Sequence, residues 1–327
     1  MPGPLVTVGE TRAFIESVFG ASRASSNGLN VAVRCPRPEC DSSRDPRKLK
    51  LVIRVTDHLL HCWVCGFKAR SLLPLLLRHG TRDAVATYRE RFLAGRLIDV
   101  PLDEQHTPVR LPDDFRLLAT ASGTDKTAQR ALRYVRARGF AERELWRLRP
   151  GVSDDPTWHD RVLMPSFDAT GELTFFTGRA FSPGMIGYNN CDADKNSVVF
   201  NEINVDWKSR LVLCEGPFDL AKCGDNAVPL LGSSLAEDSA LMDSLLAHAT
   251  PVALALDADM RQRTQTLGRR LSEYGLDVLV VDLRGHHDPG EMTRQEFAAC
   301  LTEARPWSWH GMFTARLDRA TRTSARI

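Results

Sequence analysis

The sequence has no long hydrophobic run. None of its apolar stretches approaches the roughly 20 residues that a helix needs to span a bilayer. Its first residues, MPGPLVTVGETRAF, also lack the basic segment and apolar core of a secretory signal peptide. We therefore expect a cytoplasmic protein that does not act at a membrane. Thiols stay reduced in that compartment, so the eight cysteines favour a metal site over disulfides.

Three common catalytic signatures are missing as well. The sequence contains no GxGxxG, no GxxxxGKS/T and no GxSxG element. These absences argue against a dinucleotide-dependent enzyme, a P-loop ATPase or helicase, and an α/β-hydrolase. There is no internal repeat and no long low-complexity tract. The 327 residues are enough for two or three domains with cores of their own.

The net charge is only +2, but the charges are unevenly distributed. Residues 126–149 carry eight Lys or Arg against two Glu, and residues 31–70 carry nine basic against four acidic side chains. Residues 206–304 reverse the balance, with nine basic and sixteen acidic side chains. A basic front and an acidic back favour a polyanionic partner held near a cation site. The alternative for each basic cluster is a solvated helix face.

Four cysteines near the start have the spacing of a zinc ribbon. Cys35 and Cys40 form one pair within CPRPEC, and Cys62 and Cys65 form a second within CWVC. Between them, Lys48–Val55 alternates in polarity like an exposed β-strand. Four thiolates fill a tetrahedral Zn²⁺ shell, so this zinc would be structural. It would supply folding energy that so short a segment cannot obtain from a core.

The same ribbon offers side chains to a nucleic acid. Lys48 and Lys50 are candidates for phosphate contacts, and Trp63, inside the second cysteine pair, is a candidate for stacking on a base. Packing of Trp63 over the cysteines is an equally good interpretation. His58 and His61 also remain as possible replacements for one of the thiolate ligands.

The middle of the chain is predicted to be a basic mixed α+β region. The segment DRVLMPSFDATGELTFFTGRAF has two strand-like runs around an Ala-Thr-Gly turn, which indicates a β-hairpin. Arg161 precedes the first run and Arg179 ends the second, and Lys195 follows in a polar loop. Such cations beside an acidic metal cluster would suit a triphosphate or a template strand. The alternative is that they are exposed hairpin charges.

The last third of the chain alternates strand and helix, which predicts a mainly parallel sheet. Two buried strands, Leu211–Cys214 and Val252–Leu256, end in carboxylates: Glu215 follows the first, and Asp257 and Asp259 follow the second. Carboxylates at the carboxyl ends of neighbouring parallel strands converge on one crevice. Oxygen-rich clusters of this kind suit Mg²⁺ or Mn²⁺, and those ions suit phosphate chemistry.

A third acidic element, DPGE, contributes Asp288. Any one of these carboxylates would ordinarily be interpreted as a helix cap or a surface acid. Three sites, each just past a strand of one predicted sheet, favour a common function.

These motifs resemble those of the bacterial and phage DnaG-like DNA primases. EGPFD, DAD and DPGE are similar to the three acidic motifs of a Toprim domain, and LGSSL is similar to the segment between the first two. DRVLMPSFDATGEL and FTGRAF resemble the primase strands that lead into that domain, and the ribbon resembles the primase zinc-binding domain. The resemblance covers roughly residues 30–300.

The resemblance implies a fold of three parts in one α/β multidomain chain. These are a β-rich zinc ribbon for template binding, a mixed α+β basic subdomain, and a Toprim α/β domain with a mainly parallel sheet. The expected boundaries are 1–72 for the ribbon, 73–112 for a helical linker, 113–208 for the basic subdomain, 209–305 for the Toprim domain and 306–327 for a basic tail.

The resemblance also implies an activity: synthesis of short RNA primers on single-stranded DNA from ribonucleoside triphosphates, with Mg²⁺ or Mn²⁺. No helicase domain is recognised, so any replicative helicase would be met in trans, in a phage or plasmid setting. The resemblance assigns metal ligation to the acidic residues, with Glu215 either a ligand or the proton acceptor; these are Glu215, Asp257, Asp259 and Asp288. It assigns binding of template or triphosphate to the basic residues, which are Arg179, Arg161 and Lys195.

The sequence departs from the family pattern at several points. Gly187-Tyr188 replaces the usual Lys-Tyr, and Met260-Arg261-Gln262 replaces the usual Arg-Ala-Gly. Phage primases read the template with an acidic residue and a histidine before the second cysteine pair. Asp57 lies at the matching distance, but the histidine, His58, is shifted by one. The recognised trinucleotide therefore does not carry over.

Two other classes remain open. A Toprim nuclease would use the same carboxylates with water as the nucleophile. A non-catalytic DNA-binding relic of a primase would keep the ribbon and lose the chemistry.

Overall fold

The computed structural model describes residues 5–25, 28–40, 48–93, 96–97, 108–182, 184–185, 187–232 and 234–308. Two compact units are distinguished, and each is described by itself. The first comprises Met1–His106, Ala236–Ala249 and Glu273–Gly275, and the second comprises Thr107–Leu235, Thr250–Ser272 and Leu276–Ile327. Residues 94–95 and 98–107 of the expected linker and most of the expected basic tail lie outside the described residues.

The first unit opens with helix α1 (Val8–Phe19), which buries Thr11 and Ile15. Its start is encoded locally: the Thr7 side chain accepts a hydrogen bond from the Glu10 amide, and the Glu10 carboxylate accepts one from the Thr7 amide. The short strand β1 (Leu5–Val6) precedes the helix and pairs in parallel with β7 (Arg96–Leu97).

The ribbon is an antiparallel five-stranded sheet, in which each strand pairs with the next along the chain. Its strands are β2 (Ser22–Ala24), β3 (Asn30–Val33), β4 (Leu51–Arg54), β5 (Leu60–Cys62) and β6 (Lys68–Ala69). In β4 the burial alternates residue by residue, as the polarity pattern predicts, with Leu51 and Ile53 fully buried. The β-rich ribbon is therefore confirmed.

Helices follow the ribbon. Helix α2 (Leu73–His79) is short and buries its first four residues. Helix α3 (Arg82–Thr87), capped by the Thr81 hydroxyl, continues into one turn of π-helix, Tyr88–Leu93. A π-helical turn is uncommon and often marks a functional or strained position. Here it turns Tyr88 and Phe92 inward, and Phe14 of α1 packs against both rings.

The second unit contains two sheets. The first is antiparallel, in the order β12-β11-β10-β9-β8. Its strands are β8 (Arg116–Leu117), β9 (Gly151–Val152), β10 (Arg161–Phe167), β11 (Leu173–Ala180) and β12 (Tyr188–Asn190). The predicted hairpin is β10 and β11, and the Asp168 carboxylate holds its turn by accepting hydrogen bonds from the Thr170 and Glu172 amides.

Helices α4 (Lys126–Ala137) and α5 (Glu142–Leu148) lie between β8 and β9 in the chain. In α4 the buried residues recur every three or four positions, at Ala128, Ala131, Leu132 and Val135, so the arginines between them face solvent. The basic character of this region therefore lies on one exposed helix face.

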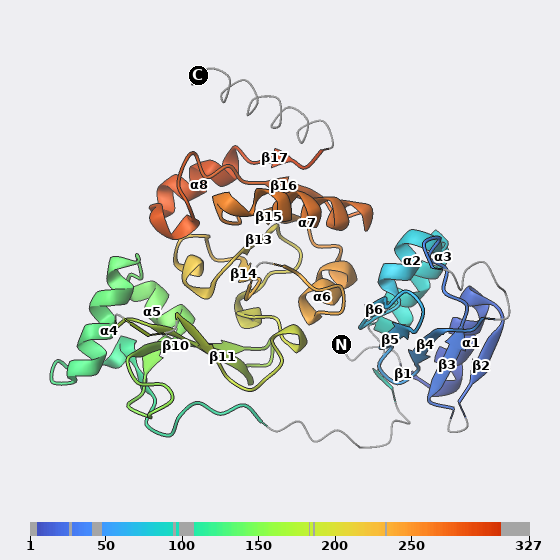
Figure 1. Ribbon diagram of the computed structural model, residues 1–327, viewed down its shortest axis with the longest axis horizontal. Helices are drawn as coiled ribbons and strands as arrows, with labels where there is room; N and C mark the ends of the chain where they lie inside the picture. The colour runs from blue at the N-terminus through green and yellow to red at the C-terminus, as the bar shows by residue number, and fades with distance from the viewer. Residues whose placement is uncertain are drawn as a thin grey trace. The chain divides into compact units, whose positions relative to one another are not determined.

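The second sheet has the order β14-β13-β15-β16-β17. It is built from β13 (Leu211–Cys214), β14 (Ala227–Pro229), β15 (Val252–Leu254), β16 (Val278–Val280) and β17 (Arg305–Pro306), and it is labelled in Figure 1. Every pair is parallel except β16–β17, so the expected mainly parallel sheet is confirmed. β13, β14 and β15 are buried throughout, which explains why they read as continuous apolar runs in the sequence.

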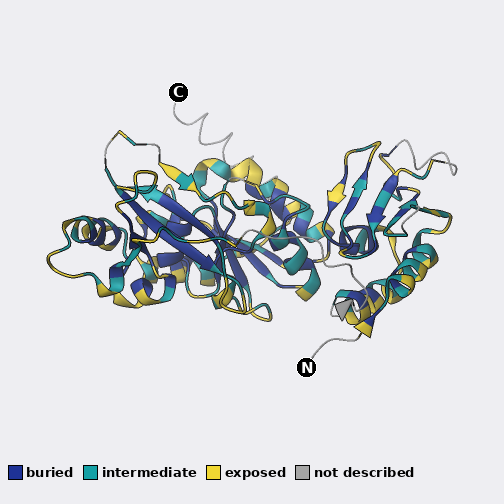
Figure 2. Ribbon diagram, turned by 90° about the horizontal axis from the view of Figure 1, so that it is seen from below, coloured by how far each residue is buried: buried dark blue, intermediate teal, exposed yellow. Residues whose placement is uncertain are grey.

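Three helices follow strands of this sheet along the chain: α6 (Ala240–His248), which belongs to the first unit, then α7 (Arg261–Glu273) and α8 (Arg294–Thr302). Figure 2 shows buried strands, while exposed residues gather on helices and loops. Trp307, just past β17, packs on Gly268 of α7, where an added Cβ would lie 2.5 Å from the indole ring. No helix in the described part of the chain combines the length and apolarity that a membrane span requires.

The segment after β13 differs from the prediction in form. A helix is expected near 219–225, and the chain forms a five-residue 3₁₀-helix at Pro217–Ala221 instead. Asp219 closes this turn, because its carboxylate accepts a hydrogen bond of 2.9 Å from the Gly216 amide. The 3₁₀-helix has its C-cap at Lys222, and Gly224, two residues later, has a left-handed φ of 90°.

Candidate functional site

The candidate catalytic site is assembled at one edge of the parallel sheet. Glu215 directly follows β13, Asp257 is the third residue after β15, and Asp288 lies in the loop after β16. These three strands are parallel neighbours, so their carboxyl ends lie at the same edge. The topology therefore brings together carboxylates that are up to 73 positions apart in the sequence.

The tightest group at this edge contains a residue that the sequence did not single out. Ligand atoms of Asp257, His287 and Asp288 all lie within 4.8 Å of one another. The expected proximity of Asp257 to Asp288 is thus present, and His287 joins them. Its only signal in the sequence is its position immediately before the DPGE motif.

Burial and mutual repulsion disfavour negative charge at this edge. The pKa of Asp257 is raised to about 7, first by burial and then by Glu215, Asp219 and Asp288. One oxygen of Glu215 (Oε2) and one of Asp257 (Oδ1) are buried without a hydrogen-bond partner. Unpartnered buried carboxylate oxygens are costly. A divalent cation would bond to them and offset the repulsion, so these residues fit a metal site.

Asp219 supports the group from the 3₁₀-helix. Its pKa is raised to about 6, mainly by burial, although the hydrogen bond from the Gly216 amide opposes the shift. Gly290 leaves room on the other side. A Cβ there would lie 2.8 Å from Oδ1 of Asp288 and 3.6 Å from Oδ1 of Asp219. A side chain at position 290 would therefore push into the carboxylates.

Asp259 lies outside the three-residue group. It belongs to the 3₁₀-turn Ala258–Met260 that leads into α7. It lines a hollow of about 650 Å³, whose other lining residues include Ser234, Arg263 and Arg270. A carboxylate flanked by two arginines and a hydroxyl makes this hollow polar enough for a charged ligand.

Arg179 connects the hairpin sheet to the carboxylates. It lies on β11, paired with Tyr188 of β12, and its guanidinium stacks over the Tyr188 ring at 4.6 Å from the ring centre. Its charge lowers the pKa of Asp219, so it faces the acidic edge. The Tyr188 hydroxyl lies 3.3 Å from the position of a Cβ on Gly216. A cation and a phenol thus border the first acidic motif.

The other two predicted cations have different environments. Arg161 is 7% exposed, and its Nη1 donates to the Gly178 carbonyl across the hairpin. That burial favours a role in holding β10 to β11. Lys195 is exposed, and its Nζ donates a hydrogen bond of 3.2 Å to the Leu231 carbonyl. It lies beside the LGSSL segment and remains accessible to a ligand.

The four cysteines form the second candidate site. Cys35, Cys40, Cys62 and Cys65 have sulfurs within 4.8 Å of one another, and the first three are buried. The Cys40 and Cys62 sulfurs are 3.7 Å apart. Sulfurs bonded to one zinc at about 2.3 Å lie about 3.8 Å apart at tetrahedral corners. The group therefore fits structural zinc, and no histidine belongs to it among the described residues.

The ribbon residues expected to contact nucleic acid differ in exposure. Trp63 is 70% exposed and packs on His61, with ring centres 4.3 Å apart. It is therefore a surface residue, and the alternative of packing over the cysteines does not describe it. Lys48 and Lys50 are exposed as well.

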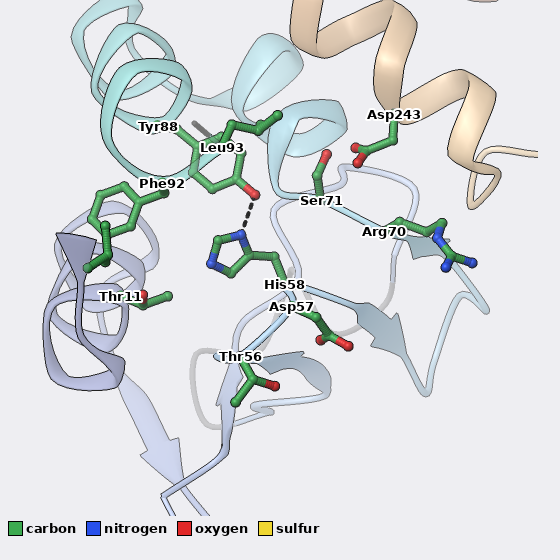
Figure 3. A pocket seen from close by; sticks show the side chains of 11 residues that line it. Thr11, Thr56, Asp57, His58, Arg70, Ser71, Tyr88, Phe92, Leu93 and Asp243 are labelled. Atoms are coloured by element: carbon green, nitrogen blue, oxygen red, sulfur yellow. Dashed lines mark hydrogen bonds between the residues drawn. The ribbon is translucent and has the colours of Figure 1, made fainter. Parts of the chain in front are cut away.

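His58 and Asp57 lie at a small hollow of about 220 Å³ (Figure 3). His58 is 8% exposed, and its Nδ1 lies 2.7 Å from the Tyr88 hydroxyl, which accepts the Leu72 amide hydrogen. Burial lowers the pKa of His58 to about 4, so its ring is neutral at physiological pH. Asp57 is exposed and accepts a hydrogen bond of 2.8 Å from Nε of Arg54. Asp57 is thus more accessible to a template than His58.

No protein-family model and no curated protein matches the chain. The chain is similar in fold to several solved structures, among them the following three. For the Aquifex aeolicus primase (zinc-binding and RNA polymerase domains), the TM-score is 0.46 at 17% identity, covering 95% of this chain and 88% of that one. For a DnaG primase catalytic domain bound to single-stranded DNA, the TM-score is 0.48 at 19% identity, covering 60% of this chain and 78% of that one.

For the primase fragment of the bacteriophage T7 primase-helicase protein, the TM-score is 0.41 at 13% identity, covering 81% of this chain and 96% of that one. With identities below 20% and TM-scores below 0.5, these likenesses do not by themselves assign a function.

Proposed function

We propose that this protein is a DNA primase, which synthesises short RNA primers on single-stranded DNA from ribonucleoside triphosphates. The observation that carries the proposal is the convergence of three acidic motifs at one edge of a parallel sheet, with unpartnered buried oxygens on Glu215 and Asp257. Such a cluster suits divalent cations and phosphoryl transfer. The zinc ribbon gives this chemistry a nucleic-acid template.

In this proposal Asp257 and Asp288 would hold a Mg²⁺ or Mn²⁺ ion, and Glu215 and Asp259 are further candidate ligands. The metal, when bound, neutralises charge on the attacking and leaving oxygens of the nucleotidyl transfer. Glu215 is also placed to accept the proton of the attacking 3′-hydroxyl. Asp219 acts indirectly, since it holds the 3₁₀-turn that orients Glu215.

Arg179 and Lys195 bind the triphosphate or the template. Arg179 borders the acidic edge on a strand stiffened by pairing on both sides, so its guanidinium is preorganised. Stacking on Tyr188 restricts it further. Lys195 adds a more mobile cation near residue 231. The phosphates would thus lie between cationic side chains and the carboxylate-held metal.

The ribbon grips the template. Trp63 offers an exposed ring for stacking on a base, and Lys48 and Lys50 offer charges to the phosphates. Asp57 is accessible to a base edge, whereas His58 is buried and shapes the wall beside it. A replicative helicase acting in trans would be a further partner.

The test is primer synthesis by the purified protein. Labelled ribonucleotides, single-stranded DNA of random sequence and Mg²⁺ or Mn²⁺ should yield short RNA. Asp257→Ala and Glu215→Gln should lose it while keeping the wild-type circular dichroism spectrum. Arg261→Ala, an exposed position at the start of α7, serves as a surface control. DNA degradation without nucleotide incorporation would replace the proposal with a nuclease, and normal synthesis by either carboxylate variant would remove the site assignment.

A further inference from the structure

His287 is held in place by its backbone. Its amide donates a hydrogen bond of 2.8 Å to the Glu291 carboxylate, and its carbonyl accepts one of 2.8 Å from the Ala258 amide. The second bond ties the loop after β16 directly to the residue that follows Asp257. The position of this histidine relative to Asp257 is therefore set by main-chain contacts on both sides.

The imidazole itself is available. The side chain is about 58% exposed and makes no hydrogen bond within the described residues. Its Nδ1 lies 3.8 Å from Oδ2 of Asp288, beyond hydrogen-bonding distance. Ligands at right angles around an ion with bonds of about 2.1 Å lie about 3.0 Å apart. Rotation of the exposed ring would therefore bring its nitrogen to the spacing expected for a ligand that shares one ion with Asp257 and Asp288.

We propose that His287 is a nitrogen ligand of the catalytic metal and gives this site a preference for Mn²⁺ over Mg²⁺. The inference rests on the proposed function only in assuming that the acidic edge binds a divalent cation. Mg²⁺ prefers an all-oxygen shell, whereas imidazole binds transition metals more strongly. Replacing one oxygen ligand by a nitrogen therefore favours the ion that accepts nitrogen.

The neighbouring histidine supplies a matched control. His286 lies one residue earlier, is less exposed than His287, and acts electrostatically on Glu296 of α8 rather than on the carboxylates. His286→Ala thus removes the same chemical group from the same loop. His287→Asn retains a neutral ligand but offers oxygen in place of the ring nitrogen.

The experiment uses the full zinc-loaded chain with added Mn²⁺. Electron spin echo envelope modulation should detect nitrogen coupled to Mn²⁺ in the wild type and in His286→Ala, and should lose it in His287→Ala. Competition titrations should show Mn²⁺ affinity falling about 10-fold or more in His287→Ala, the scale typical of lost metal-site support, with a much smaller loss for Mg²⁺. His287→Asn should also lower the ratio of Mn²⁺ affinity to Mg²⁺ affinity below that of the wild type.

The failures of the two proposals are distinguishable. Primer synthesis by a wild type that shows no nitrogen coupling would overturn the role of His287 and leave the primase proposal standing. Nitrogen coupling in a protein that makes no RNA would support the ligand and overturn the primase. Persistent coupling in His287→Ala, or equal losses for both metals, would also overturn the inference.

Discussion

Burial of His58 makes the stability of the ribbon depend on pH. The ring is 8% exposed, and its pKa in the folded protein is about 4, against about 6.5 in the unfolded chain. Because the folded pKa is the lower one, the unfolded chain takes up a proton first as pH falls. Stability is therefore complete above pH 6.5 and is lost as pH falls from 6.5 towards 4.

The size of the effect follows from the two pKa values. Each pH unit between them costs about 1.4 kcal/mol, so the ribbon should lose about 2 kcal/mol of unfolding free energy between pH 7.5 and 5. His58 has a φ of 60°, a left-handed conformation that asparagine tolerates. His58→Asn therefore removes the titrating group with the least backbone strain.

Hydrogen–deuterium exchange of peptides covering β4 and β5, in excess zinc, would measure this change. Peptides from β13 and β15 serve as the reference within the same molecule. Tyr88→Phe is the matched control: it should lower stability at every pH, because the Leu72 amide loses its acceptor, yet keep the slope, because burial is the main cause of the shift. An unchanged pH slope in His58→Asn would refute the reasoning.

Two further predictions concern the metal sites. Cys62→Ser, or removal of zinc by a chelator, should abolish hydrogen-exchange protection in β4 and β5 while β13 stays protected. The reason is that the bound zinc stabilises only the ribbon. Loss of protection in both units would contradict this. Gly290→Ala should lower divalent-metal affinity about 10-fold with the circular dichroism spectrum unchanged, because its Cβ would lie 2.8 Å from a carboxylate oxygen of Asp288. Isothermal titration with Mn²⁺ measures this affinity. An affinity equal to that of the wild type would show that the loop accommodates the methyl group.

Local patterns were sufficient for much of the fold. The apolar run Leu211–Cys214 coincides with β13, and the turn between β10 and β11 lies where the Ala-Thr-Gly sequence predicted it. The cysteine spacing predicted the four-thiol group. These features depend on contacts within a short segment or on one dominant periodicity, so the sequence displays them directly.

Other features depended on contacts that spacing does not encode. Asp257 and Asp259 are two residues apart, yet only Asp257 joins the tight group, because the 3₁₀-turn at Ala258–Met260 rotates the chain between them. The resemblance offers His58 as a template contact, but the π-helical turn packs against it and buries its ring on Tyr88. In each case the exposure and the neighbours of the side chain depend on how the adjacent segment folds.

By itself, the sequence determined most of the strands, the spacing of the four cysteines and the presence of three acidic motifs after buried strands. Only the tertiary structure decided which carboxylates meet, that His287 joins them, and that Arg179 faces them from another sheet. The physical reason is distance along the chain. Residues separated by 30 to 70 positions become neighbours only through strand order and loop conformation, whereas periodicity and spacing describe the chain locally.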